Sequence, residues 1–422
     1  MALLAALPLA GCHMASPAAH TTEIQTIPMT HSSPAKPSAK RSLAVLAASA
    51  ALLTGAAAAP HAVRAADAPI WVTAYYPVWN QSGALTPDKI DYSAITHLVH
   101  FAIVPRADGT IEDTIHGTMN AITPAQSQDV VSRAHKAGDK VLICLGGAGT
   151  GPLISPVIAP AKRAAFVQNL VAFVKARGYD GIDVDMEPIL PADEGNFVAF
   201  VKDLRVALKA ANPSYLLTFP ASGEPGNQPK LCALLKDDFN QINIQTYDLS
   251  GTWDGFKTWY NGSLYGDGKT LMTDTRPFPS ASEKVGLYTA AGVPAAKLGL
   301  GIAFYGYLWK GATGPGQSIQ GVTTETVGYT DIMDKYFAPG AYHWDATAHA
   351  PYLSFTGPGP ADKKFISYDD AKLTAEKVTY ARTHGLGGVI IWQLGSEYRP
   401  DQPAGKRSVL LQAVKEAAQA SR

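Results

Sequence analysis

One short segment of the sequence holds an unusual concentration of carboxylate side chains. Four acidic residues fall within eight positions, at Asp180, Asp183, Asp185 and Glu187. Side chains alternate along an extended strand, so the last three would point to one face, spaced about 6 to 7 Å apart. Like charges this close in a partly dry site cannot all ionise freely, and at least one pKa should rise. A carboxylic acid with a raised pKa can act as a general acid.

The segments around this cluster alternate short apolar runs with amphipathic stretches. That rhythm is typical of a parallel α/β fold. Eight apolar runs are present, the number of strands that a (β/α)8 TIM barrel needs, and the acidic segment ends the fourth of them. The predicted strands are Trp71–Tyr75, His97–Val104, Lys140–Leu145, Gly181–Asp185, Tyr215–Phe219, Gln241–Tyr247, Leu298–Phe304 and Gly387–Gln393.

The stretches between these strands complete the predicted architecture. Helical patterns occupy most of them, for instance Ala161–Arg177 and Asn196–Ala211, which runs into the stop signal Asn212-Pro213. One spacing is much longer and is rich in Gly, Pro and aromatic residues. We expect it to form a small inserted α+β lobe, at about 306–364, between the seventh and eighth strands.

Other interpretations of the acidic segment are weaker. A solvated strand edge conflicts with the apolar flanking residues, and a closed barrel has no edge. A helix would also align Asp180, Asp183 and Glu187, but Gly181, Pro188 and the β-branched residues between them disfavour it. A calcium loop of the EF-hand type needs a Gly at its sixth position, which is absent. We therefore expect no metal site.

Composition limits the classes of partner. The 422 residues carry 35 Lys and Arg against 35 Asp and Glu, and the sequence pI is near 7.2. This balance provides no basic field for nucleic acid. Three cysteines cannot form a disulfide framework, so burial of the 46% hydrophobic residues must hold the fold together. We expect a monomer without cofactors.

Residues 1–66 are predicted to be a signal and processing segment that precedes a catalytic domain at 67–422. Basic residues lead into the apolar run Ser42–Ala59, and small residues follow as far as Ala66. Because the basic region begins after Met29, that residue, or alternatively Met14, is the expected true start. This arrangement predicts export, without a stable membrane span. A lipoprotein box ending at Cys12 is the minor alternative, because no Lys or Arg precedes it.

The motifs along the mature chain resemble those of glycoside hydrolase family 18, the chitinases and their relatives. The acidic segment is similar to the signature on the family's fourth strand. Further similarities follow in the family's order and cover the whole mature chain. They are Val72–Trp79, Leu145-Gly146-Gly147, Gln245-Thr246-Tyr247-Asp248, Lys297–Gly306, Phe365–Asp370 and Gly385–Gln393. The inserted lobe resembles the insertion of one bacterial chitinase subgroup.

The resemblance implies a role for each matching residue. Glu187 would be the general acid and base of a substrate-assisted, retaining mechanism. Asp185 would orient the acetamido group of the sugar, and Asp183 would share a proton with Asp185. Tyr247 would hydrogen-bond the same acetamido group. The residues expected to bind substrate are Asp180 (as a support of the strand end), Asp248, Trp392 (as the floor beneath one sugar), Tyr75, Gly147, Trp253 and Gln245.

Three departures from the family pattern affect the expected rate and preference. Cys144 stands in place of a Ser, Gln245 in place of an apolar Met, and Tyr307 in place of a frequent Arg. The resemblance still implies a secreted hydrolase of β-1,4 bonds between N-acetylglucosamine units of chitin. The alternatives are an endo-β-N-acetylglucosaminidase for glycoprotein glycans or a peptidoglycan hydrolase, and a non-catalytic chitin-binding relative, which typically lacks the acid that Glu187 supplies here.

Overall fold

Eight parallel strands close into a barrel, as the sequence predicts. The computed structural model describes residues 69–111, 115–116, 119–120, 122–223, 226–268 and 277–420. Around the barrel the strands follow the order β1-β15-β9-β8-β7-β6-β5-β2, and every neighbouring pair is parallel. Their bounds are β1 Trp71–Pro77, β2 His97–Ile103, β5 Lys140–Gly147, β6 Gly181–Met186, β7 Leu216–Ala221, β8 Gln241–Ile244, β9 Leu298–Ala303 and β15 Gly388–Trp392.

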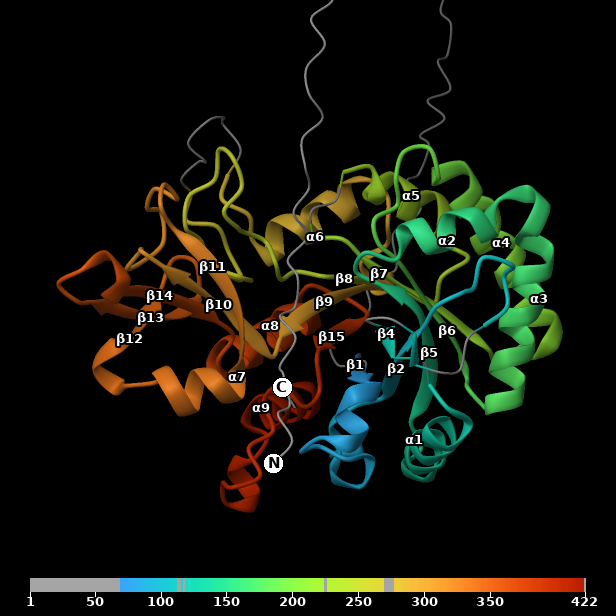
Figure 1. Cartoon of the computed structure of the whole chain (residues 1–422), viewed down its shortest axis with the longest axis horizontal. Coiled ribbons are helices and arrows are strands. Elements are labelled where there is room, and N and C mark those ends of the chain that lie inside the picture. Colours follow the sequence, from blue (N-terminus) through green and yellow to red (C-terminus); the bar gives the residue numbers. More distant parts are fainter. Residues whose placement is uncertain are drawn as a thin grey trace, which may run out of the picture. The chain divides into compact units, whose positions relative to one another are not determined.

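Helices follow most of the strands and cover the outside of the barrel (Figure 1). Local signals mark their ends: in the first helix, Thr123 and Gln126 form a reciprocal capping box and Gly138 ends the helix with φ 92°. The helices are α1 Pro124–Ala137, α2 Gly151–Ile158, α3 Pro160–Arg177, α4 Glu194–Ala211, α5 Gln228–Leu235, α6 Ala281–Ala290, α7 Tyr329–Asp331, α8 Ala371–Thr383 and α9 Val409–Gln419. A short hairpin pairs β3 Ile115–His116 with β4 Met119–Asn120.

A second sheet lies between β9 and β15 in the sequence, at the position of the predicted insertion. It is antiparallel, has five strands in the order β11-β10-β14-β13-β12, and appears at the left of Figure 1. Its strands are β10 Tyr305–Lys310, β11 Thr323–Gly328, β12 Tyr342–Asp345, β13 Ala350–Thr356 and β14 Lys363–Tyr368. The sheet is wider in sequence than the expected 306–364, because Phe365–Tyr368 completes β14 and α8 begins only at Ala371.

The barrel strands alternate between two buried environments. In β6, Ile182, Val184 and Met186 belong to the main core that joins the barrel to its helices. Asp183 and Asp185 lie between them in sequence and are also buried. They therefore face the other way, into the barrel.

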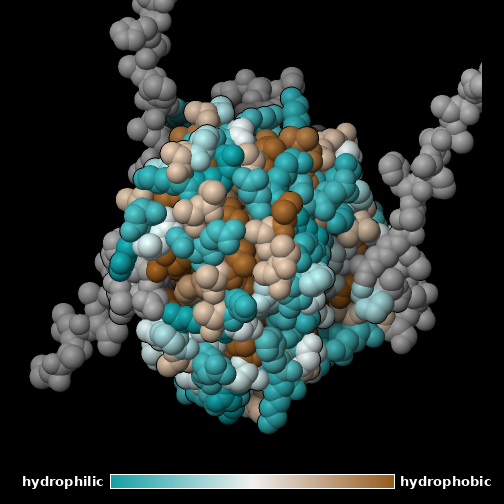
Figure 2. Space-filling model, turned by 90° about the vertical axis from the view of Figure 1, so that its right-hand side faces the viewer, coloured by the Kyte–Doolittle hydropathy of each residue, from teal (hydrophilic) through white to brown (hydrophobic). Residues whose placement is uncertain are grey.

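The surface, the cysteines and the helices of the described residues add three further observations about the fold. Figure 2 views the side where α3 and α4 lie, and hydrophilic and hydrophobic residues are interspersed there. Cys144 and Cys232 are both free and buried. No single helix among the described residues is long and apolar enough to cross a membrane; only α2 and α3 together, bent by 106°, reach that length and composition. The predicted signal segment, with Cys12 and Met29, lies outside the described residues.

Candidate active site

Asp183 is held by two hydroxyl groups from neighbouring strands inside the barrel. The hydroxyl of Tyr75 in β1 donates to Oδ2 at 2.7 Å, and that of Thr218 in β7 donates to Oδ1 at 2.5 Å. Thr218 is the register partner of Asp183 on the adjacent strand. Burial raises the pKa of Asp183 to about 6, although both hydroxyl donors act to lower it. The carboxylate is thus fully buried and has a donor on each oxygen.

Asp185 lies two residues further along the same face and has weaker partners. The thiol of Cys144 is 3.9 Å from its Oδ2, and Oδ1 has no hydrogen-bond partner among the residues that the structure describes. Burial, followed by the charge of Glu187, raises the pKa of Asp185 well above its usual range. Burial and the neighbouring charge thus both favour the protonated form of Asp185.

Glu187 follows β6 directly, is half-buried and is fixed at both its backbone and its side chain. Its carbonyl oxygen accepts a hydrogen bond of 2.7 Å from the backbone N–H of Gly151, the first residue of α2. A Cβ atom on Gly151 would lie 2.3 Å from the carbonyl oxygen of Pro188, so this close approach requires glycine. The carboxylate Oε1 accepts a hydrogen bond of 2.8 Å from Nε2 of Gln245.

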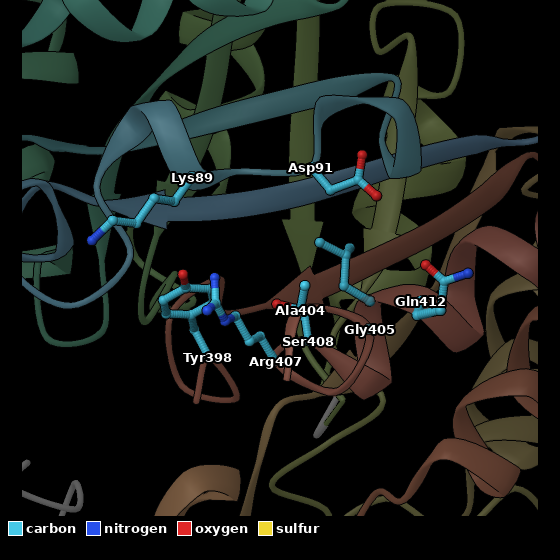
Figure 3. A pocket seen from close by; sticks show the side chains of 9 residues that line it. Lys89, Asp91, Tyr398, Ala404, Gly405, Arg407, Ser408 and Gln412 are labelled. Carbon is cyan, nitrogen blue, oxygen red and sulfur yellow. The ribbon is translucent and has the colours of Figure 1, made fainter. Parts of the chain in front are cut away.

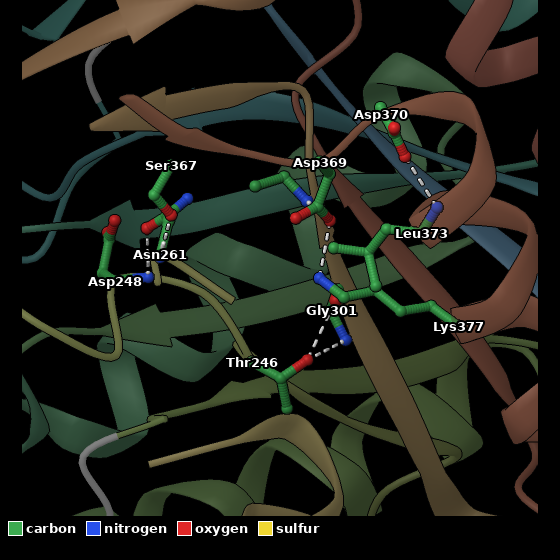
Figure 4. A network of polar contacts seen from close by, with 10 residues as sticks. Thr246, Asp248, Asn261, Gly301, Ser367, Asp369, Asp370, Leu373 and Lys377 are labelled. Atoms are coloured by element: carbon green, nitrogen blue, oxygen red, sulfur yellow. Dashed lines mark hydrogen bonds and ion pairs between the residues drawn. The ribbon is translucent and has the colours of Figure 1, made fainter. Parts of the chain in front are cut away.

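Tyr247 lies beyond the end of β8, because that strand is shorter than predicted. The strand ends at Ile244, where the Thr246 N–H turns back to the Ile244 carbonyl at 2.8 Å. The Thr246 hydroxyl then bonds Gly301 of β9 in place of a ladder partner (Figure 4). Burial, with the charges of Asp248 and Glu187, raises the pKa of Tyr247. Its buried phenol therefore remains a hydrogen-bond donor.

Asp248 is exposed and is held by residues of the inserted sheet. Its backbone is in the left-handed region, with φ 55°, and its N–H donates to Oδ1 of Asn261 at 2.9 Å. The N–H of Asn261 donates in turn to the Ser367 hydroxyl of β14 at 2.5 Å (Figure 4). The hydroxyls of Tyr305 and Tyr307 in β10 both donate to Oδ1 of Asp248, at 2.5 and 2.7 Å.

A buried ion pair lies behind this loop. Lys377 of α8 donates to Oδ2 of Asp369 at 2.6 Å, and the same oxygen accepts from the Ala303 N–H at 3.2 Å (Figure 4). Both side chains are almost fully buried. The pair joins the start of α8 to the last residue of β9, which makes it a structural support of the barrel beside the inserted sheet.

Aromatic rings continue from Tyr75 to the exterior. Trp392, the last residue of β15, packs 5.4 Å from Tyr75 and edge-on to Phe101 at 4.9 Å, measured between ring centroids. Phe101 also contacts Trp79 at 5.8 Å, and Trp79 is 37% exposed. Apolar sugar faces stack on rings of this kind. The aromatic group begins at a residue that bonds Asp183, so it borders the acidic cluster.

Three of the residues predicted to bind substrate, Asp180, Trp253 and Gly147, contribute no side chain to the acidic cluster. Asp180 precedes β6 and bonds the side chains of His135 at 2.7 Å and Lys140 at 3.0 Å. This is the start of the strand, whereas the acidic cluster is at its end, so Asp180 supports the strand and does not reach the cluster. Trp253 is 40% exposed and packs on Phe256, and among the described residues it has no hydrogen bond or ring contact with the cluster.

Gly147 has a backbone role. It ends β5 beside Met186, and its carbonyl accepts a hydrogen bond of 2.6 Å from the Thr150 hydroxyl. Its φ of 123° lies in the region that favours glycine. The residue shapes the strand end next to Glu187 and presents no side chain to a ligand.

Sequence reasoning missed several residues that hold the carboxylates. Thr218 could have been found, because it is the one polar residue in the buried run of β7. Asn261 and Ser367 could not, since their contacts depend on the path of a long loop and on the inserted sheet. Tyr305 was visible only as a member of a strand motif, and Tyr307 only as a departure from the family pattern.

The acidic cluster is separate from the pocket in Figure 3, and its side chains are not arranged to hold a metal ion. Among the described residues, no group of three or more His, Cys, Asp or Glu side chains is arranged to hold a metal ion. The pocket in Figure 3 is lined by other residues, between the segment that leads into β2 and the start of α9. They include Lys89, Asp91, Tyr398 and Arg407.

Comparisons with known proteins agree with this geometry. The family model "Glycosyl hydrolases family 18" matches residues 72–397. Chitinase A1 of Niallia circulans is 33% identical over 290 residues, which are 61% of this chain and 40% of that protein. Endochitinase 1 of Metarhizium robertsii is 28% identical over 381 residues, 83% of this chain and 87% of that protein. This chain therefore spans less than half the length of the first relative and most of the second.

One solved structure with the same fold belongs to a protein that is described as binding sugar without being an active chitinase. Human YKL-39 is described as a pseudo-chitinase with retained chitooligosaccharide binding properties. It superposes with a TM-score of 0.69 at 20% identity, covering 83% of this chain and 100% of that one. Likeness of fold alone therefore does not separate a hydrolase from a binding protein, and the side chains of the site must carry that argument.

Proposed function

The chain belongs to family 18 of the glycosyl hydrolases, and from this premise we propose that it is a chitinase of the bacterial kind with an inserted sheet. It would cleave β-1,4 bonds between N-acetylglucosamine units with retention of configuration. The observation that carries this proposal is Glu187 at the end of β6, two residues beyond the buried Asp185. A binding protein has no need of such an arrangement, because burying carboxyl groups is costly.

The arrangement supports a substrate-assisted reaction in two steps. In the first, Glu187 protonates the glycosidic oxygen while the acetamido carbonyl oxygen of the same sugar attacks C1, and the C1–O bond breaks. Asp185 hydrogen-bonds the acetamido N–H, which favours the charged oxazolinium ion that forms. In the second, Glu187 takes a proton from water as the water oxygen attacks C1. The acetamido group is released and Glu187 regains its proton.

The surrounding residues fit supporting roles in this scheme. The buried Tyr247 remains a neutral donor for the acetamido oxygen, since the pKa of its phenol is raised by burial. Trp392 and its aromatic neighbours offer a stacking surface for the sugar ring. Asp248 presents an exposed carboxylate to a sugar hydroxyl.

A digest of the N-acetylglucosamine hexamer by wild type and by Glu187→Gln tests the proposal. Products are resolved by mass and by anomer. We expect β-anomeric di- and trimers from the wild type and a fall in kcat of at least about 10²-fold in the variant, the scale of general acid catalysis. A wild type that binds the hexamer without cleaving it is instead a binding protein. Cleavage of glycoprotein glycans or peptidoglycan, but not of the hexamer, would assign one of the other substrates.

Export is proposed on the signal segment alone. Residues 1–66 would be removed near Ala66, freeing a monomeric enzyme outside the cytoplasm. The mass of the mature protein from an expressing culture tests this. A chain that starts near Asp67 supports export, whereas a lipid-modified chain that starts at Cys12 would mean anchoring to a membrane.

A further inference from the structure

The side-chain amide of Gln245 contacts the proposed acid directly. Its Nε2 donates to Oε1 of Glu187 at 2.8 Å, across 58 residues of sequence. The backbone N–H of Gln245 donates to the carbonyl of Ala221, the last residue of β7, at 2.8 Å. The backbone of Gln245 is therefore anchored to a barrel strand, and its side chain reaches from there to Glu187.

The same residue precedes Tyr247 by two positions, in the segment that follows β8. Burial raises the pKa of Tyr247, and a hydrogen bond from Gln245 acts against this rise. The buried Asp185 lies two residues before Glu187, at the end of β6. The contact of Gln245 with Glu187 therefore lies next to the acidic cluster.

The donor restricts where the acid can carry its proton. A protonated carboxyl group has one carbonyl oxygen, which accepts hydrogen bonds, and one hydroxyl. An N–H group that donates to Oε1 favours the carbonyl at Oε1 and therefore the hydroxyl at Oε2. We propose that Gln245 is a positioning residue of the general acid, which orients the Glu187 carboxyl group and assigns its proton to Oε2. This role is distinct from the substrate contact expected from sequence, and it rests on the proposed function.

Two substrates with different leaving groups separate these roles. The N-acetylglucosamine hexamer loses a sugar hydroxyl, which must be protonated as it leaves. The 4-nitrophenyl glycoside of the N-acetylglucosamine dimer loses a stable phenolate, which leaves without that help. For Gln245→Met, we expect kcat to fall about 10- to 100-fold on the hexamer, within the range of general acid catalysis, and less than about 3-fold on the aryl glycoside. KM should change little on either substrate.

A matched variant controls for the substitution itself. Gln412 donates to Oε1 of Glu416 at the same distance of 2.8 Å, on the exposed face of α9. Gln412→Met should leave both rates unchanged. Gln245→Asn keeps an amide but draws it back by one methylene, and it should show the same selective loss if reach to Glu187 matters. Thermal unfolding of each variant identifies any that does not fold.

The remaining outcomes overturn the inference. An equal fall of kcat on both substrates would mean that Gln245 acts on the acetamido group or on the bound sugar. Unchanged rates on both would mean that the 2.8 Å contact does not influence the acid. A wild type that cleaves neither substrate would overturn the proposed function and this inference together.

Discussion

Tyr75 in β1 and Cys144 in β5 each contact one buried carboxylate, and the two contacts differ in strength. The hydroxyl of Tyr75 is 2.7 Å from Asp183, whereas the thiol of Cys144 is 3.9 Å from Asp185. A thiol is a weak donor even at a shorter distance. The cysteine at this position therefore leaves Asp185 with little support, and the site depends more on Tyr75.

Replacing each residue should show this contrast. Tyr75→Phe leaves Oδ2 of Asp183 buried without its donor, which should lower the free energy of unfolding by about 1–3 kcal/mol. The pKa of Asp183 should rise further above about 6, because the lost donor favours the carboxylate. Cys144→Ala should change kcat on the hexamer less than about 3-fold, since little hydrogen bonding is lost. Chemical unfolding measures the free energy of unfolding of each variant, and steady-state kinetics measures kcat on the hexamer. A larger loss of kcat in Cys144→Ala than in Tyr75→Phe would contradict this ranking.

Residue types and spacing predicted only part of the site. The alternation in β6 indicated that Asp183 and Asp185 share a face, because a strand has a period of two. Asp180 precedes the strand and supports its start, because a residue before the strand lies at the opposite end from Glu187. The partner of Gln245 could not be predicted, since its contact with Glu187 joins residues 58 positions apart.

At the scale of elements, the inserted sheet reaches the site through two paired strands. Tyr307 of β10 and Ser367 of β14 are register partners, so their side chains lie on the same face. Tyr307 donates to the Asp248 carboxylate, while Ser367 accepts from Asn261, which holds the Asp248 backbone. The sheet therefore fixes both the side chain and the strained backbone of a predicted sugar contact.

Removing one hydroxyl from this sheet should weaken binding more than chemistry. Tyr307→Phe leaves Asp248 with Tyr305 as its remaining phenol donor, so the carboxylate is less well oriented. We expect KM for the hexamer to rise about 3- to 10-fold, the worth of one hydrogen bond, with kcat within about 2-fold. Tyr352→Phe in β13, on the other side of β14, is the control and should leave KM unchanged. A fall in kcat at constant KM would instead place Tyr307 in the chemical step.

The element boundaries show which strands can be predicted from local sequence patterns. Most of the predicted barrel strands match the observed ones within two residues at each end, because an apolar run covered on both faces is unambiguous. The sixth fails at its end, since the Thr246 hydroxyl replaces the ladder bonds to Gly301 and ends β8 early. The strand order of the inserted sheet could not be predicted, because its pairings join segments distant in sequence.

At the scale of the whole molecule, the acidic cluster makes global stability depend on pH. Burial raises the pKa of Asp183 from 3.8 to about 6, so the folded protein binds this proton more tightly than the unfolded chain does. The resulting stabilisation is complete below the unfolded pKa of 3.8 and is lost as the pH rises through about 6. A shift of this size corresponds to about 3 kcal/mol.

Asp183→Asn should remove this dependence, because the amide keeps an oxygen acceptor but cannot ionise. Between pH 4 and pH 7, the free energy of unfolding of the wild type should fall relative to that of the variant by up to about 3 kcal/mol. Urea unfolding at several pH values measures the difference, and subtraction cancels groups that both proteins share. Asp237→Asn, at a carboxylate that is 87% exposed, should run parallel to the wild type. If Asp183→Asn also ran parallel, the barrel would tolerate the buried charge without cost, and its pH dependence would have to come from another group.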